Sequence, residues 1–301
     1  MKSALHLPLW FLKTKLLGQK KPLQTVLFIN DLCNLQCKHC NIYNIKNPIT
    51  KTFEQIREEL QYCYDQGSRF VDFEGGEPTL WKEGDRTLND ILDLAKEIGF
   101  FSTTVTTNAT RPFPNLKADA IWVSLDGIGK YHDMIRGEGV FDKLVKNIET
   151  CGHPDLSVNM VVNSLNYTSV EDTIEFAKQN PHIKSISINI YTPFGGPEND
   201  RLHLDWDKRI EMLDKVIALK KKGYPIMNSV SGLKLMKHNK FKKQCWVTNF
   251  VMVNGDRLDR CQGYRDGACD YCGFCMAGEM RSVMTFKPDT ILAGLKLRMN
   301  S

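Results

Sequence analysis

The sequence lacks any run that could cross a membrane: no stretch of its 301 residues holds 18 consecutive apolar residues free of charge. It also lacks a convincing secretory signal. Residues 1 to 21 begin apolar, but Lys13 and Lys15 interrupt the run and no small-residue cleavage site follows. We therefore expect a cytoplasmic protein.

The sequence also has too few cysteines for a disulfide-stabilised protein and too little positive charge for a typical nucleic-acid-binding protein. Ten cysteines in a chain of this length are too few for a disulfide scaffold, so we expect metal ligands or buried thiols in a reducing compartment. The net charge of +5 is only mildly basic and lacks the clustered Lys and Arg of nucleic-acid-binding proteins. What the composition does provide is 42% hydrophobic residues, enough for a sizeable core.

Strand-like and helix-like runs alternate from residue 25 to residue 193. The expected strands cover 25–30, 69–75, 101–108, 120–127, 155–163 and 183–193, with helical patterns over 52–67, 87–99, 139–151 and 168–180. Such alternation predicts parallel βαβ units whose right-handed crossovers curl the sheet. We expect an α/β fold, namely a partial (β/α)6 TIM-like barrel with a small cysteine-rich C-terminal domain. Functional groups should then gather at the carboxyl ends of the strands.

Three regions are predicted along the chain. Residues 1–22 form a basic amphipathic segment, 23–200 the partial barrel, and 201–301 a helix followed by a cysteine-rich domain. In the first region Leu9, Leu12 and Leu16 recur at helical spacing among lysines. This pattern predicts either a short helix packed on the barrel or a basic helix lying on a membrane surface.

Three cysteines lie close together in "INDLCNLQCKHCNIYN" (29–44), directly after the first expected strand: Cys33, Cys37 and Cys40. A structural zinc site usually has four ligands, and His39 shares a tight turn with Cys40, so both would reach one ion only awkwardly. Three thiolates suit a [4Fe–4S] cluster in which one iron keeps a free position for a small molecule. Zinc or inert thiols are the plainer alternatives.

The segment CNLQCKHC resembles the CxxxCxxC signature of the radical S-adenosylmethionine (SAM) enzymes. Further motifs follow in that family's order. "FEGGEPTL" (73–80) is similar to its GGEP motif, "TTN" (106–108) to its TN motif, and "SLDG" (124–127) with "YHDMIRG" (131–137) to its SLDG…HDxIRG stretch. The resemblance covers about residues 23 to 200. It implies an enzyme that reductively cleaves SAM at a [4Fe–4S] cluster, giving a 5′-deoxyadenosyl radical that abstracts hydrogen from a substrate or adds to it.

The resemblance also implies roles for single residues around the cofactor. Cys33, Cys37 and Cys40 would bind the catalytic cluster. Gly75 and Gly76 would let the backbone come close to SAM, because glycine tolerates unusual dihedral angles.

Charged and polar residues of the later motifs would hold the SAM molecule itself. Glu77 would orient its amino group, while Ser124 and Arg136 match positions that contact its carboxylate, which an arginine fork suits. Asn108 and Asp126 would serve the ribose or the loop geometry. A turn residue that caps its own backbone is an equal alternative for these two.

The C-terminal region carries five more cysteines: Cys245, Cys261, Cys269, Cys272 and Cys275. Closely spaced C-x2-C pairs among glycines and turn residues argue for metal, with zinc as the alternative to iron and sulfur. The pattern resembles the SPASM or twitch auxiliary-cluster domains of radical SAM enzymes, although a full SPASM pattern has seven cysteines. The resemblance implies one auxiliary [4Fe–4S] cluster, with Cys245, Cys261, Cys272 and Cys275 as the preferred ligands and Cys269 as the spare.

The substrate has two enzymatic interpretations. The SPASM/twitch resemblance favours a peptide or protein, with a reductant such as flavodoxin or ferredoxin as partner. A looser resemblance to adenosylhopane-synthase-like members would imply a lipid or isoprenoid, with peripheral membrane contact through residues 1–21 that brings the barrel mouth to the bilayer. From another class comes a non-enzymatic Fe–S or zinc module. Tyr191, Asp205 and Glu279 are candidates for a catalytic acid, base or hydrogen donor.

Overall fold

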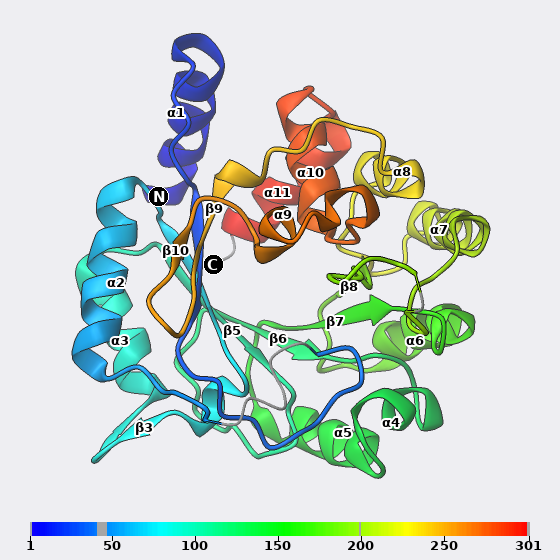
Figure 1. Ribbon diagram of the computed structural model, residues 1–301, viewed down its shortest axis with the longest axis horizontal. Helices are drawn as coiled ribbons and strands as arrows, with labels where there is room; N and C mark the ends of the chain where they lie inside the picture. The colour runs from blue at the N-terminus through cyan, green and yellow to red at the C-terminus, as the bar shows by residue number, and fades with distance from the viewer. Residues whose placement is uncertain (1, 41–46, 199, 300–301) are drawn as a thin grey trace.

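A single mixed sheet organises the computed structural model, which describes residues 2–40, 47–198 and 200–299 (Figure 1). The sheet has eight strands in the order β10-β9-β1-β2-β5-β6-β7-β8, parallel except for β10. Six of them confirm the predicted strands: β1 (Gln24–Phe28), β2 (Phe70–Glu74), β5 (Ser102–Thr107), β6 (Ala120–Ser124), β7 (Leu156–Val162) and β8 (Ile186–Ile190). The predicted α/β partial barrel is thus confirmed.

Helices connect the strands at the predicted places: α2 (Phe53–Gln66), α3 (Leu88–Ile98), α5 (Val140–Cys151) and α6 (Val170–Gln179). Their ends follow local chemistry. A capping box of Thr52 and Gln55 starts α2, and Gly67 ends it in a positive-φ conformation. Short elements that the periodicity did not indicate are α4 (Lys130–Arg136) and the β3 (Lys82–Glu83)–β4 (Arg86–Thr87) hairpin.

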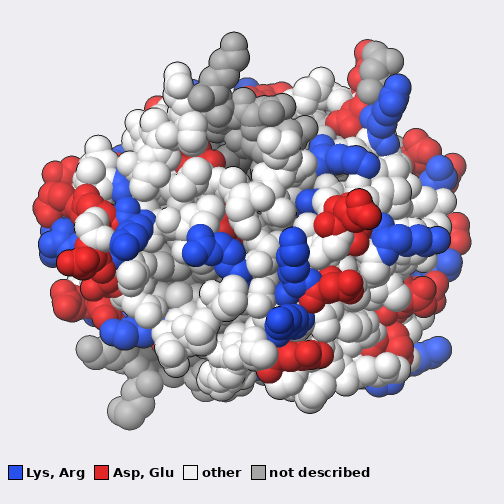
Figure 2. Space-filling model, turned by 90° about the horizontal axis from the view of Figure 1, so that it is seen from below, with Lys and Arg blue, Asp and Glu red and all other residues white. Residues whose placement is uncertain are grey.

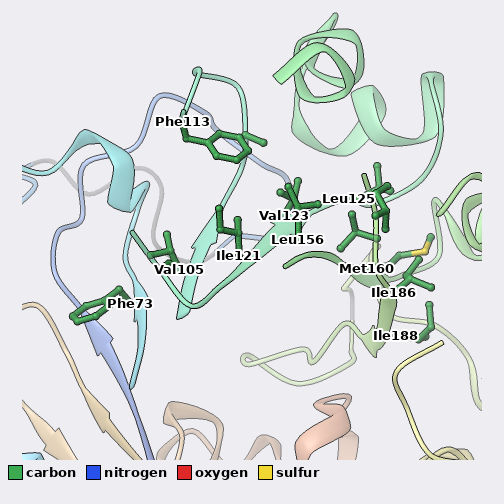
Figure 3. Packing of buried hydrophobic residues seen from close by; sticks show 14 of the residues in the cluster. Phe73, Val105, Phe113, Ile121, Val123, Leu125, Leu156, Met160, Ile186 and Ile188 are labelled. Atoms are coloured by element: carbon green, nitrogen blue, oxygen red, sulfur yellow. The ribbon is translucent and has the colours of Figure 1, made fainter. Parts of the chain in front are cut away.

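The core lies between the outer face of the sheet and these helices. Side chains that alternate along the strands meet there, among them Phe73, Val105, Ile121 and Leu156, all fully buried (Figure 3). The residues between them face inward. Thr106 of β5 donates to Asp72 of β2 at 3.3 Å, and Asn189 of β8 donates to Asn159 of β7 at 2.6 Å. Val26, Trp122 and Val161 lie on the same face, so the barrel interior is a mixed surface that carries polar pairs.

The C-terminal region completes the same sheet. β9 (Thr248–Val251) pairs in parallel with β1, and β10 (Arg257–Leu258) folds back on it. At the other sheet edge, the Ile190 amide of β8 donates to the Gly273 carbonyl at 2.9 Å. The sheet thus crosses the predicted domain boundary at residue 200.

Five further helices surround this closure: α7 (Trp206–Lys221), α8 (Val230–His238), α9 (Gln262–Arg265), α10 (Cys275–Met284) and α11 (Pro288–Met299). The first helix of the chain, α1 (Lys2–Leu17), precedes β1 and lies at the amino ends of the strands (Figure 1). Within the described ranges, no helix is long and apolar enough to cross a membrane.

Candidate active site

The cysteine loop, residues 30–40, follows β1 at the carboxyl end of the sheet, where the fold predicted it. Backbone hydrogen bonds tie it to two other motifs. The Gly76 and Glu77 amides donate to the Asn30 and Leu32 carbonyls at 2.8 Å each, and the Lys38 amide donates to the Ile135 carbonyl of α4 at 2.9 Å. The motifs after β2 and β6 therefore hold the loop in place.

The three thiols of this loop lie close enough to influence one another. Burial raises the pKa of Cys37 to about 11, and Cys40 and Cys33 add to that rise while Arg136 opposes it. Burial also raises the pKa of Cys33, with Cys40 again contributing. Burial makes it costly for these thiols to ionise without a nearby positive charge. A cationic iron–sulfur centre would supply that charge and bind them as thiolates. The donor set therefore fits the predicted cluster.

Two glycines make the approach between the loops possible. A Cβ at Gly75 would lie 2.4 Å from the Asn30 carbonyl oxygen, and one at Gly76 would lie 2.3 Å from that of Leu32. Neither glycine has a positive φ. What demands glycine here is the contact with the cysteine loop, whereas the sequence interpretation placed the close approach at SAM.

Glu77 is almost wholly buried and its carboxylate already has protein partners. Oε1 accepts from the Thr107 hydroxyl at 2.7 Å and from the Thr79 hydroxyl at 2.6 Å, and Oε2 accepts from the Asn108 amide at 2.8 Å. The side chain thus joins the ends of β2 and β5. The expected contact with the SAM amino group remains a prediction.

Asn108 connects β5 to the cysteine loop. Its Nδ2 donates to Asn34 Oδ1 at 3.0 Å and lies 3.9 Å from Cys33 Sγ, while its Oδ1 accepts from the Thr110 amide at 2.9 Å. The residue therefore caps its own turn and also contacts Cys33. These contacts agree with the turn-capping interpretation, and a role toward the SAM ribose stays a prediction.

Arg136 and Asp126 form a buried ion pair next to the second cysteine. Arg136 Nε donates to Asp126 Oδ2 at 2.6 Å, and Arg136 Nη1 lies 3.9 Å from Cys37 Sγ. Burial disfavours the Asp126 charge, but Arg136, His39 and His132 outweigh it and hold the pKa of this carboxyl below its ordinary value. The guanidinium thus lies between the Asp126 carboxylate and the Cys37 thiol.

Two histidines complete this buried polar group, and the sequence analysis assigned neither to it. His39 Nε2 lies 3.6 Å from Asp126 Oδ2, and His132 Nδ1 accepts from the Asp126 amide at 3.1 Å. Burial lowers the pKa of His132 to about 4, so its ring is neutral. The quoted HDMIRG motif was the available signal for His132.

The remaining candidates are more distant from the cysteines or already have partners. Ser124 ends β6 and is half-buried. The Tyr191 hydroxyl donates to Asp200 at 2.9 Å, Asp205 pairs with Lys208, and Glu279 accepts from the Ser229 hydroxyl at 2.7 Å. Tyr191, Asp205 and Glu279 thus each have a partner within the protein, and their part in catalysis stays a prediction.

Four C-terminal cysteines, here called the auxiliary cysteine group, come together beside β9: Cys245, Cys261, Cys269 and Cys272. Burial raises the pKa of Cys245 to about 12, and the thiols of Cys261, Cys272 and Cys269 add to the rise. Cys269 also raises the pKa of Cys261 and of Cys272, in each case after burial. The four thiols therefore lie near enough to influence one another's ionisation, although no three potential ligands among the described residues are already grouped closely enough to hold a metal ion.

Cys275 has different surroundings. Burial raises its pKa to about 12, Glu279 and Cys272 add to the rise, and its Sγ lies 3.6 Å from the Ser187 hydroxyl of β8. Cys269 thus influences three other cysteines and Cys275 is influenced by Cys272, and the preference for Cys275 as the fourth ligand stays a prediction. The sequence could not separate them because both stand in a C-x2-C pair.

Helices α7 and α8 hold the loop of the auxiliary cysteine group. Arg209 of α7 is buried and donates to the Cys272 carbonyl at 3.0 Å and to the Met236 carbonyl at 2.8 Å. Asn239 donates to the Cys269 carbonyl at 2.9 Å. Burial lowers the pKa of Arg209 to about 10, with Cys272 opposing the fall.

The carboxyl face of the sheet carries charge of both signs. Figure 2 views the molecule from below Figure 1, and Lys and Arg are interspersed there with Asp and Glu. Among the described residues visible on this face, no continuous basic surface of the kind that nucleic acid needs is present.

Comparison with known proteins agrees with this site. The chain is 27% identical over 248 residues to an Fe-coproporphyrin III synthase of Methanosarcina barkeri, covering 73% of this chain and 60% of that protein. It is 24% identical over 200 residues to the mycofactocin maturase MftC of Mycolicibacterium smegmatis, covering 62% and 49%. The chain thus spans about half to three-fifths of these curated relatives.

The fold itself has solved counterparts. The crystal structure of Streptococcus suis SuiB bound to its precursor peptide SuiA superposes with a TM-score of 0.65 at 18% identity, covering 94% of this chain and 66% of that one. The sequence profile described as "Radical SAM superfamily" matches residues 27–177, half of the chain and every motif of the cysteine-loop site. The chain belongs to the radical SAM superfamily, whose enzymes use a [4Fe–4S] cluster and S-adenosylmethionine.

Proposed function

We propose that this radical SAM enzyme acts on a peptide or protein substrate, with two metal centres. Cys33, Cys37 and Cys40 hold the catalytic [4Fe–4S] cluster, and the auxiliary cysteine group holds a second one. When bound, the catalytic cluster and SAM together supply the 5′-deoxyadenosyl radical that abstracts hydrogen from the substrate. A small electron carrier such as flavodoxin or ferredoxin provides the reducing electron.

The observation that carries this proposal is the gathering of four thiols beside β9, in a region that closes the barrel. A solved counterpart that is similar over nearly the whole chain was crystallised with a precursor peptide. The inner face of the barrel, with Asn189 donating to Asn159 at 2.6 Å, offers hydrogen bonds to an amide backbone.

The chain's own residues would prepare the cofactor site. Arg136, held by Asp126, presents its guanidinium beside Cys37 and keeps positive charge where thiolate and SAM carboxylate meet. Asn108 steadies Cys33. Ser124 at the end of β6 remains the proposed second contact to the SAM carboxylate.

A lipid substrate loses its main support. A lipid substrate would need the N-terminal helix to bring the barrel mouth to a membrane. Since α1 precedes β1 and the cysteine loop follows it, the two lie at opposite ends of the sheet (Figure 1). An apolar cavity of about 360 Å³ borders α1, α10 and α11, but it lies at the amino ends as well. Membership of the radical SAM superfamily argues against the alternative of a non-enzymatic Fe–S or zinc module.

The test of catalysis is anaerobic reconstitution with iron and sulfide, then addition of dithionite and SAM, with 5′-deoxyadenosine measured by chromatography. Wild type should form it, and Cys37→Ala should not, while still holding the iron of the auxiliary centre. Turnover by Cys37→Ala at the wild-type rate would refute the assignment of the catalytic cluster.

The substrate class is tested with deuterated compounds. A candidate precursor peptide, deuterated at Cα and Cβ, should transfer deuterium into 5′-deoxyadenosine. Transfer from an isoprenoid or a porphyrinogen, with none from peptides, would overturn the peptide assignment.

The auxiliary centre is tested by a matched pair of variants. Cys269→Ala should lower iron by about four atoms per chain, one cluster's content, whereas Cys275→Ala should keep it. The opposite result would restore the ligand set preferred from sequence.

A further inference from the structure

Helix α1 has two apolar faces, of which the protein covers one. Trp10 is buried against the amino end of the sheet, with its ring 5.9 Å from that of Trp246, and its Nε1 donates to the Lys21 carbonyl at 2.8 Å. Leu7 and Phe11 pack into the same cluster. These contacts fix the orientation of the helix on the body of the protein.

The opposite face exposes a row of leucines, here called the leucine stripe: Leu5, Leu9, Leu12 and Leu16. Their exposed fractions are 67%, 45%, 49% and 76%. Spacings of four, three and four residues place all four on one side of the helix. Figure 1 shows α1 projecting beyond the sheet, so no neighbouring described element covers this side. A helix that is apolar on two faces but packed on one needs a second partner.

Charge identifies that partner. Residues 1–22 contain five lysines and no Asp or Glu. Lys13, Lys20 and Lys21 are exposed and form no ion pair with any described residue. An apolar row flanked by lysines matches a surface with apolar depth and negative headgroups. A second copy of the chain would instead bring the same lysines face to face.

The covered side of α1 also contacts the turn between α10 and α11. Phe286 packs edge-to-face on Phe11 with ring centroids 5.2 Å apart. Lys15 lies over the Phe286 ring at 4.9 Å and donates to the Met284 carbonyl at 2.9 Å. These contacts hold α1 from its covered side and leave the leucine stripe exposed.

We propose that the leucine stripe docks this protein on an anionic phospholipid bilayer, with α1 lying in the plane of the interface. The cysteine loop lies at the other end of the sheet from α1, so the docking surface and the cysteine loop are separate parts of the molecule (Figure 1).

The experiment is flotation of full-length protein with vesicles of phosphatidylcholine alone or of phosphatidylcholine with phosphatidylglycerol. Wild type should float with the anionic vesicles and stay in the dense fraction with the neutral ones. Leu5→Ser/Leu9→Ser/Leu12→Ser/Leu16→Ser should reduce flotation by roughly tenfold or more, since interfacial binding scales with the apolar area buried. Circular dichroism and thermal unfolding of this variant should match wild type, because the side chains are exposed.

Charge is tested separately with matched pairs. Lys20→Gln/Lys21→Gln should lower flotation roughly tenfold, because each lysine near an anionic surface contributes to binding. Lys143→Gln/Lys146→Gln, an exposed pair on α5, makes the same charge change elsewhere and should have no effect.

Three results would overturn the proposal: wild type that stays in the dense fraction, a stripe variant that floats like wild type, or a wild-type dimer that the stripe substitutions convert to a monomer. The last would assign the stripe to a second copy of the chain. None of these readouts depends on the metal centres, so their outcome is independent of the proposed catalytic function.

Discussion

Arg136 and Asp126 show how one buried pair serves both folding and the site. Asp126 is fully buried and Arg136 is 8% exposed. Taking two such groups out of water is unfavourable unless each compensates the other, and Asp126 also accepts from the Val161 amide at 3.0 Å. The pair therefore fixes the guanidinium beside Cys37 through a contact that the protein cannot easily rearrange.

We expect Arg136→Met to destabilise the metal-free protein by about 3–5 kcal/mol, because it leaves the Asp126 carboxylate buried without its cation. Urea denaturation followed by circular dichroism measures this. Lys237→Met, which breaks an ion pair between the half-buried Lys237 and the exposed Asp214, is the control and should cost about 1 kcal/mol or less. Adding Asp126→Asn to Arg136→Met should recover part of the loss; equal effects of Arg136→Met and the control would contradict this account.

Glu279 predicts a pH dependence of stability. Burial raises the pKa of this carboxyl to about 7 from an ordinary 4.5, so the folded protein holds the proton more tightly than the unfolded chain does. Its contribution to stability is therefore complete below pH 4.5 and is lost as the pH rises through 7. Glu279→Gln removes this loss while keeping an oxygen for the Ser229 amide.

The stability of Glu279→Gln relative to wild type should accordingly increase by about 3 kcal/mol between pH 4.5 and pH 7.5. Urea denaturation of the metal-free proteins at four pH values in this range measures the difference. A difference that stays constant with pH would show that Glu279 ionises normally.

At the scale of elements, the turn after β2 and the cysteine loop form one unit. The Gly75–Gly76 backbone approaches residues 30–32 so closely that a single methyl group cannot enter. The conformation of the cysteine loop is thus determined by the turn after β2, which is remote from the loop in sequence.

We expect Gly76→Ala to displace the cysteine loop, costing about 1–3 kcal/mol in stability, since overpacking forces backbone shifts. The measurement is made in the Cys269→Ala background, where the remaining iron reports on the catalytic cluster alone. In this background Gly76→Ala should bind much less iron per chain than one cluster contains. Gly195→Ala is the matched control, because nothing lies within 4 Å of its added Cβ and its φ is not positive. Full iron content in Gly76→Ala would mean that the loop tolerates the shift.

At the scale of the whole molecule, the two ends of the described chain meet in one sheet. β1 has β2 on one side and β9 on the other, and Cys275 donates its amide to Asn189 Oδ1 of β8 at 2.8 Å. Sheet hydrogen bonds and the core thus connect the barrel to the cysteine-rich region, which leaves little basis for independent folding.

One cooperative unfolding transition should therefore be seen, with coincident urea curves from far-ultraviolet circular dichroism and tryptophan fluorescence. Trp246 reports the C-terminal region and Trp122 the middle of the sheet, so the fluorescence covers both predicted domains. Removal of residues 240–301 should give an aggregating product, because it uncovers the edge of β1. A soluble truncated protein with a native-like spectrum would argue for separate domains.

The sequence by itself determined the six barrel strands, the order of the motifs and, through them, the superfamily. Strand alternation, caps and the CxxxCxxC spacing are properties of neighbouring residues, and such local patterns are legible without a structure. The expectation that some cysteines are buried thiols is met by Cys63 and Cys151, which lie outside both cysteine groups.

Only the tertiary structure decided which remote groups meet. In the folded chain β9 pairs with β1, and Cys269 lies near Cys245. Gly76 and Asn108 contact the cysteine loop, and α1 lies at the opposite end of the sheet from that loop (Figure 1). The physical reason is that these contacts join segments tens or hundreds of residues apart, whose pairing depends on the packing of the whole chain and leaves no periodic trace in the residues themselves.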